Sequence, residues 1–423
     1  MASFVFRPVA STGAFRDVTC GMRPHMRRVA LSPHRQFDDV GRVASLKSSR
    51  KAWPLRYALL ITLAAVWFGS VCSDGHAADR IVLRDLTVIA DQTVRDFNLD
   101  GVVLDDGKRL RWDEIESGKL AANQAEFDQL LREIGGPLYR VRQRLKVGDY
   151  RGASEPVEEL YPRFVGRISE SAFLVLHTTV WSRMSAGRRE AAVAPWLRCF
   201  ALLQRHPEYL KSISGDRRLS VELETGLCAD LLPIWLDAEQ ARVAMPQVRE
   251  AAQAIPEPRP DGVLYYAGTL ALAAGDHEWA GRVLASLNQA DQAARELQLL
   301  AKSAILFHEK KSAEALLLLR SVSDWSPGTR PLAWYSIGLA EIASNDAREK
   351  REGVLHLLRL PAGYSTSQPE ICGAALFLAS DTLESLEDQR GSIALRRELT
   401  SRFGDTVFAK RVQLDLQEPP PEK

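Results

Sequence analysis

Two pairs of glutamates have a spacing that could support catalysis. Glu222 and Glu224 are two residues apart, and Glu384 and Glu387 are three residues apart. Two carboxyl groups that flank a glycosidic bond can act as general acid and as base or nucleophile, so either pair would suit cleavage of a carbohydrate. Acidic side chains are also common on the solvated faces of helices. We therefore interpret both pairs as surface residues and predict no catalytic residues.

The other side chains that often bind metals are scattered along the chain. Asp100, Asp105, Asp106 and Asp113 fall within fourteen residues, but they lack the alternating ligands and the closing glutamate of a calcium-binding EF-hand loop. The sequence contains no His-Glu-x-x-His motif, no glycine-rich phosphate loop and no Gly-x-Ser-x-Gly nucleophile motif. We therefore predict no metal and no cofactor. Four widely spaced histidines are predicted to be structural: His177, His206, His308 and His356.

Three cysteines, Cys199, Cys228 and Cys372, follow residue 77 and lie in apolar helical contexts. Such residues are usually buried free thiols. Cys199 and Cys228 could instead pair in an oxidising compartment, and the sequence leaves that question open.

The amino-terminal residues predict export. Residues 57–72 form an uncharged apolar run that follows several basic residues and precedes Gly75-His76-Ala77. This order is typical of a secretory signal peptide at 51–77, with cleavage after Ala77. An uncleaved membrane anchor at 57–72 is the alternative, although sixteen helical residues span only about 24 Å. Residues 1–50 are predicted to be disordered or to result from a mis-assigned start codon. The mature protein would be periplasmic or secreted.

Short β-branched runs follow the predicted signal. Gly101–Leu104 and Arg109–Trp112 flank an Asp-Asp-Gly-Lys turn, which predicts a β-hairpin. Asp113 to Ile115 is expected to open a helical turn. Residues 78–118 are therefore predicted to form a small β-rich segment that docks on the first helices downstream, because so short a segment cannot bury a large core.

Residues 119–416 have the 3.6-residue apolar period of helices, and 417–423 form a polar, proline-rich tail that is expected to be disordered. The helices are short, and Gly135-Gly136-Pro137 is expected to break the first of them. Turn residues recur at spacings of 34 to 50 residues, close to the length of a two-helix repeat. The predicted turns lie near Asp149, Gly187, Asp237, Asp276, Lys310, Asp346 and Asp388.

Residues 264–284 show the repeat most clearly, and here the chain resembles the tetratricopeptide repeat family. Leu264, Gly268, Gly275, Ala280 and Leu284 occur in the order that the family uses in one helix pair. The resemblance is clearest over 260–361 and implies a mainly α fold, a solenoid of tandem helix pairs. If Gly268 lies where two helices cross, leucine there should overpack the contact, whereas alanine is expected to be tolerated.

A solenoid of this type presents a long concave surface that suits protein partners or extended peptides. We therefore predict a non-catalytic, exported, protein-binding scaffold in the envelope or periplasm. A helical carbohydrate-active enzyme, of lyase or lytic type, is the alternative. Outward-facing polar residues of the first helix in each pair are the predicted partner contacts: Arg140, Arg144, Thr179, Tyr265, Gln298, Lys302 and Glu341. Trp325 is expected to be exposed in the loop from 321 to 329.

The charge balance argues against nucleic acid as a partner. Residues 1–77 hold eleven of the 55 basic residues and four of the 54 acidic ones, which leaves 44 basic and 50 acidic residues in the body. A mildly acidic body binds polyanions poorly. Contact with a membrane is predicted only through an uncleaved anchor.

Overall fold

The computed structural model describes residues 79–213, 215–288 and 291–417. The predicted extension at 1–50, the signal at 51–77 and residues 418–423 of the predicted tail lie outside these residues. Within the described part of the chain, no helix has both the length and the apolar character needed to cross a membrane.

The amino-terminal described residues form two small antiparallel sheets, with strand orders β2-β1-β6 and β3-β4-β5. The predicted hairpin is confirmed, because β4 pairs with β5 and Gly107 takes the positive φ of +83° that the tight turn needs. The helical turn expected at Asp113 to Ile115 is displaced, since a 3₁₀ helix covers Trp112–Glu114 and Ile115 begins β6. The strands are β1 (Arg80–Leu83), β2 (Val88–Ile89), β3 (Val94–Asn98), β4 (Gly101–Leu104), β5 (Arg109–Leu110) and β6 (Ile115–Lys119).

Ion pairs attach this β segment to the helices that follow it, as expected from its small size. Asp113 is 4% exposed and accepts a hydrogen bond from Arg142 of α3 (Gly136–Val147). Asp100 receives two hydrogen bonds from Arg167, at 2.9 and 2.6 Å. Burial and the nearby guanidinium act in opposite directions on Asp100, and the net result is a lowered pKa. Two of the aspartates considered as metal ligands are therefore occupied by arginines.

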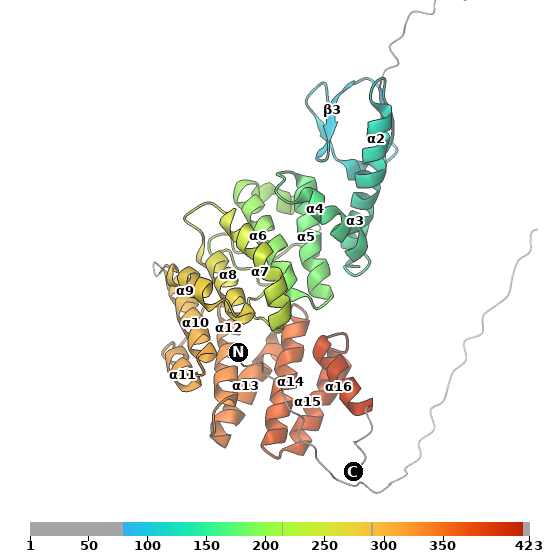
Figure 1. The fold of residues 1–423 in the computed structure, drawn as a ribbon. Helices are drawn as coiled ribbons and strands as arrows, with labels where there is room; N and C mark the ends of the chain where they lie inside the picture. The colour runs from blue at the N-terminus through green and yellow to red at the C-terminus, as the bar shows by residue number, and fades with distance from the viewer. Residues whose placement is uncertain (1–78, 214, 289–290, 418–423) are drawn as a thin grey trace, which may run out of the picture. The chain divides into compact units, whose positions relative to one another are not determined.

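Helices make up most of the remaining described chain, and consecutive helices pack against each other (Figure 1). This arrangement confirms a mainly α solenoid-like architecture behind a small β-rich segment. Together with α3, the α-helices are α2 (Gln124–Leu130), α4 (Ser154–Phe164), α5 (Glu170–Ser185), α6 (Arg189–Arg205), α7 (Ala238–Gln253), α8 (Asp261–Ala274), α9 (His277–Ala285), α10 (Gln292–His308), α11 (Ser312–Arg320), α12 (Arg330–Ile342), α13 (Ala347–Tyr364), α14 (Pro369–Ser385), α15 (Gln389–Arg402) and α16 (Val407–Gln417).

The predicted break at Gly135-Gly136-Pro137 is wrong. A π-helical turn over Leu131–Gly135 joins α2 directly to α3. Pro137 lies in the first turn of α3, where the fixed φ of proline suits a helix. The backbone therefore stays helical through a sequence that usually ends a helix.

Two kinds of residue form the predicted turns: glycines at the ends of helices and aspartates at the starts of helices. Gly148, Gly187 and Gly275 lie at or just after the ends of helices. Their φ values, between +71° and +84°, place them in the left-handed conformation. Asp276 and Asp388 instead precede helices, and their side chains accept hydrogen bonds from backbone N–H groups of the first turn. Turn residues in the sequence therefore located the helix ends.

Glycines allow two pairs of helices to cross closely. A Cβ atom built on Gly268 of α8 would lie 2.5 Å from the side chain of Leu284 in α9. The same relation recurs two pairs later, where a Cβ on Gly338 of α12 would lie 2.7 Å from Leu357 in α13. The two contacts occupy similar places in the pairs α8–α9 and α12–α13, which are separated by the pair α10–α11.

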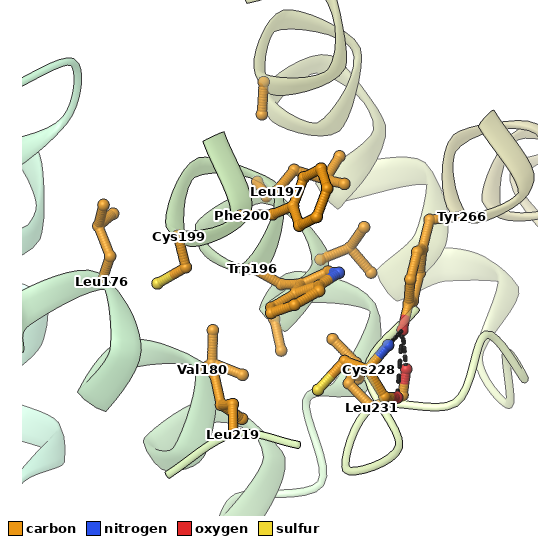
Figure 2. Close-up of a cluster of buried hydrophobic side chains, with 14 of the residues drawn as sticks. Leu176, Val180, Trp196, Leu197, Cys199, Phe200, Leu219, Cys228, Leu231 and Tyr266 are labelled. Atoms are coloured by element: carbon orange, nitrogen blue, oxygen red, sulfur yellow. Dashed lines mark hydrogen bonds between the residues drawn. The ribbon is translucent and has the colours of Figure 1, made fainter. Parts of the chain in front are cut away.

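One long connection interrupts the regular packing. Between α6 and α7 the chain runs from His206 to Asp237 with only two short 3₁₀ helices in the described residues, which explains the 50-residue spacing seen there. The phenol oxygen of Tyr266 makes two hydrogen bonds to this connection. It donates to the carbonyl of Leu231 and accepts from the N–H of Cys228. Figure 2 shows this contact beside the buried Trp196.

Residues that are far apart in the sequence also contact each other. The Gln368 side chain donates to the carbonyl of Ala229, which is 139 residues earlier. A Cβ on Gly187 would lie 3.4 Å from the Glu370 carboxylate, and Arg151 pairs with Asp405 at 3.5 Å. The helices near the carboxyl end therefore contact the region around α5 and α6 directly.

Candidate binding cavity

A cavity of about 150 Å³ lies among α8, α10 and α12. Each helix contributes residues one turn apart, such as Tyr265 and Thr269 of α8, because positions i and i+4 share a helix face. Phe307 of α10 also lines the cavity and is 36% exposed, so the cavity reaches the protein surface there. An engineered cavity of comparable volume in another protein binds benzene.

The connection before α7 forms one wall of the cavity, through Pro233, Ile234 and Trp235. The indole Nε1 of Trp235 donates to Thr269 Oγ1 at 3.0 Å. This hydrogen bond anchors the wall to α8 from inside the cavity.

Two buried charged residues at the start of α6 hold the same connection. Arg189 is 3% exposed and its Nη2 donates to the carbonyl of Leu232 at 2.8 Å. Glu190 is 1% exposed and accepts from the backbone N–H groups of Leu236 and Asp237 at 2.8 and 3.1 Å. Hydrogen bonds to charged groups are stronger than neutral ones, so this wall is held in place on both sides of Trp235.

Two tyrosines are among the residues that line the cavity. For Tyr265 and Tyr335, no hydrogen bond to the hydroxyl is present within the described residues. Burial raises the pKa of both phenols, so both remain protonated at neutral pH. His308 also lines the cavity, and partial desolvation together with the nearby His277 lowers the pKa of its imidazole, which favours the neutral form. The cavity therefore offers neutral hydrogen-bonding groups on an apolar wall.

The structure separates the predicted partner contacts into two groups. Arg140, Arg144 and Lys302 are exposed, and Gln298 is partly exposed. The outward orientation expected for Thr179, Tyr265 and Glu341 is wrong, because these residues are 0, 4 and 0% exposed. Thr179 donates to the carbonyl of Val175 within its own helix, whereas Tyr265 faces the cavity.

Glu341 is the centre of a charged cluster. Its Oε1 accepts from Arg320 at 2.7 Å, and its Oε2 lies 2.7 Å from Nδ1 of His356. Burial opposes ionisation, but these two partners outweigh it and lower the pKa of the carboxyl. This ion-paired carboxylate is fixed between α12 and its neighbours, so it contributes to packing.

Trp325 is 6% exposed, so the expectation that it stands in solvent is wrong. The buried carboxylate of Glu296 in α10 accepts hydrogen bonds from the backbone N–H of Ser326 and from the hydroxyls of Ser326 and Thr329. These bonds hold the loop against the helices and bury the indole.

The remaining residues that suggested chemistry are dispersed. Glu222 and Glu224 are exposed, and the described residues contain no group of three or more His, Cys, Asp or Glu arranged to hold a metal ion. Cys199 and Cys228 are buried free thiols near Trp196 (Figure 2). Burial raises the pKa of Cys228 to about 12, so the thiol is unreactive in this position.

No protein-family model, curated protein or solved structure matches this chain. The function must therefore be inferred from the residues themselves. Among the cavity residues, only Tyr265 was predicted from the sequence as a contact. The signal for the others was the apolar periodicity of α10 and α12, which does not distinguish a cavity wall from a packed core.

Proposed function

We propose that this protein is a non-catalytic, exported binding scaffold of tetratricopeptide-like helix pairs. Its partner is a protein or extended peptide, which inserts a side chain into the cavity among α8, α10 and α12. The observation that carries this proposal is the opening of that cavity at Phe307, where apolar residues from three helices surround a volume of about 150 Å³. Clefts with apolar walls and few polar groups are the usual form of such sites.

Exposed residues on the same helices add polar contacts. Lys302 and Gln298 lie one turn apart on α10, and the ammonium of Lys302 is 3.4 Å from the Gln298 oxygen. Their face is turned away from the residues that line the cavity, as the helical period requires. They would therefore contact a partner that extends past the cavity. With few charges involved, salt should weaken binding only modestly.

A matched pair of variants tests the binding site. Residues 78–423 would be used to capture partners from an envelope extract, followed by titration of the captured partner. Phe307→Glu places a charge at the cavity opening and should lower affinity at least tenfold. Leu317→Glu makes the same kind of change on α11, where Leu317 is 73% exposed, and should have no effect. Equal effects of the two variants would refute the proposed contact.

Export is tested separately by amino-terminal sequencing of the native protein. The proposal expects a mature start at Ala78. Recovery of intact residues 1–77 on a protein from the cytoplasmic fraction would refute export without bearing on the cavity.

A further inference from the structure

The cavity is large enough for one six-membered ring. Its volume of about 150 Å³ matches the space that accommodates benzene in an engineered protein cavity. Much of the wall is apolar, with Leu272, Leu332 and Leu339 among the lining residues. A bulky fused-ring ligand would exceed this volume, and a single methyl group would leave most of it unfilled.

The polar groups of the wall restrict the ligand further. The other hydroxyls that line the cavity include Thr269, which donates to the carbonyl of Tyr265, and Ser303, which donates to the carbonyl of Leu300 at 2.8 Å. The phenols of Tyr265 and Tyr335, like the hydroxyl of Ser336, have no such bond within the described residues. The neighbouring Tyr266 shows the contrast, because its hydroxyl is bonded to the connection before α7. A ligand that fills the cavity therefore meets lining residues whose hydroxyls lack a protein partner.

A charged ligand is disfavoured. Among the residues that the structure describes, no lysine, arginine, aspartate or glutamate lines the cavity, and transfer of an unpaired charge into such surroundings is costly. A purely hydrocarbon ring would also be disfavoured, because it would leave the two phenol hydroxyls without partners. The remaining class is a neutral aromatic ring that carries a group able to accept or donate a hydrogen bond.

We propose that this cavity binds a neutral phenol-type ring, with its polar substituent hydrogen-bonded by Tyr265 or Tyr335. This inference rests on the binding function proposed above and specifies the chemistry of its ligand. The ring can belong to a tyrosine side chain of a peptide or to a free phenolic molecule. Both sources present the same group to the cavity.

Direct titration tests this inference without any identified partner. The full-length protein would be titrated with phenol, with toluene and with the blocked tripeptide Gly-Tyr-Gly, and binding would be followed by ligand-observed NMR. Phenol should bind about tenfold more tightly than toluene, which has a similar size and no hydroxyl. Stronger binding of the tripeptide than of phenol would identify a peptide as the source, and the reverse order would identify a free phenolic ligand.

Three variants, one of them a control, assign the binding site to this cavity. Tyr335→Phe keeps the ring and removes the hydroxyl, so the preference for phenol over toluene should fall several-fold while the fold is retained. Ala304→Phe fills the cavity and should abolish binding of both probes, whereas Ala285→Phe on the exposed end of α9 should not. Circular dichroism would establish that each variant is folded.

Equal affinity for phenol and toluene, or no binding of either, would overturn the inference. These outcomes can be distinguished from a failure of the proposed binding-scaffold function. If Phe307→Glu lost partner capture but phenol did not bind, the proposed scaffold function would still be supported. If phenol bound but no partner were captured, the inferred cavity chemistry would stand and the proposed scaffold function would be refuted.

Discussion

His177 shows what complete burial does to a titratable side chain. It lies in α5 with 0% exposure, and neither ring nitrogen has a hydrogen-bond partner within the described residues. Burial lowers its pKa from 6.5 to about 3. The unfolded chain therefore binds a proton between these two pH values that the folded chain does not bind. The neutral imidazole is compatible with the fold above pH 6.5, and stability is lost as the pH falls toward 3.

We predict that His177→Leu reduces the acid sensitivity of folding. For the wild-type protein, this one group should lower the free energy of unfolding by up to about 1.4 kcal/mol for each pH unit below 6.5. Urea melts at pH 7, 5 and 4 would measure the slope, which should be smaller in the variant. His206→Leu is the control, because His206 is partly exposed and pairs with Glu208. The same slope in wild type and His177→Leu would contradict the prediction.

Helix crossings depend on glycine at two places, and Gly268 provides the test. The sequence predicted that alanine would be tolerated there, but a Cβ would lie 2.5 Å from the Leu284 side chain, which is 3% exposed. Leu284 is held by the core and can move only at a cost. We therefore predict that Gly268→Ala destabilises the protein by about 1–3 kcal/mol, and that Gly268→Leu destabilises it more.

Gly281 is the matched control for this experiment. It lies in α9, and a Cβ there would meet no atom within 4 Å. Gly281→Ala should stabilise the protein by about 0.4–1 kcal/mol, because alanine restricts the unfolded chain. Thermal melts of both variants measure the difference. If the two alanine variants changed stability in the same direction, Gly268 would not be at a tight helix crossing.

The sequence predicted the helices well because turn residues mark their ends. Gly148 and Gly275 take the left-handed conformation, and Asp276 caps the following helix. These effects are local and can be recognised from a few neighbouring residues. The exception at Gly136-Pro137 arises because a π-helical turn continues the backbone hydrogen bonding through a sequence that usually interrupts it.

The orientation of single side chains was harder to predict. In α5 and α8 almost every residue is buried, so these helices have no solvated face for the apolar period to reveal. Thr179 is buried for this reason. Glu341 is buried because Arg320 and His356, from neighbouring helices, supply partners for both of its carboxylate oxygens. The cavity was not predicted, since its wall includes a connection without helical period, which only the tertiary structure brings beside α8.

Contacts between distant segments affect the stability of the whole molecule. Deletion of residues 366–423 removes α14 to α16 and with them the Gln368–Ala229 hydrogen bond and the Arg151–Asp405 ion pair. We predict that this deletion lowers amide protection in α5 and α6 as well as in α13. Hydrogen exchange followed by mass spectrometry would map the change. Loss of protection confined to α13 would show that the distant contacts contribute little.

The bond between Gln368 and Ala229 also restricts how this protein can change during evolution. Repeat arrays usually lengthen or shorten by gain or loss of whole units, because each unit contacts only its neighbours. Here the helices from α7 to α13 lie between the two bonded residues. An inserted or deleted helix pair would move Gln368 away from Ala229 and would remove a contact with the connection that walls the cavity. This contact therefore disfavours gain or loss of whole units, and variation should accumulate in side chains and loops.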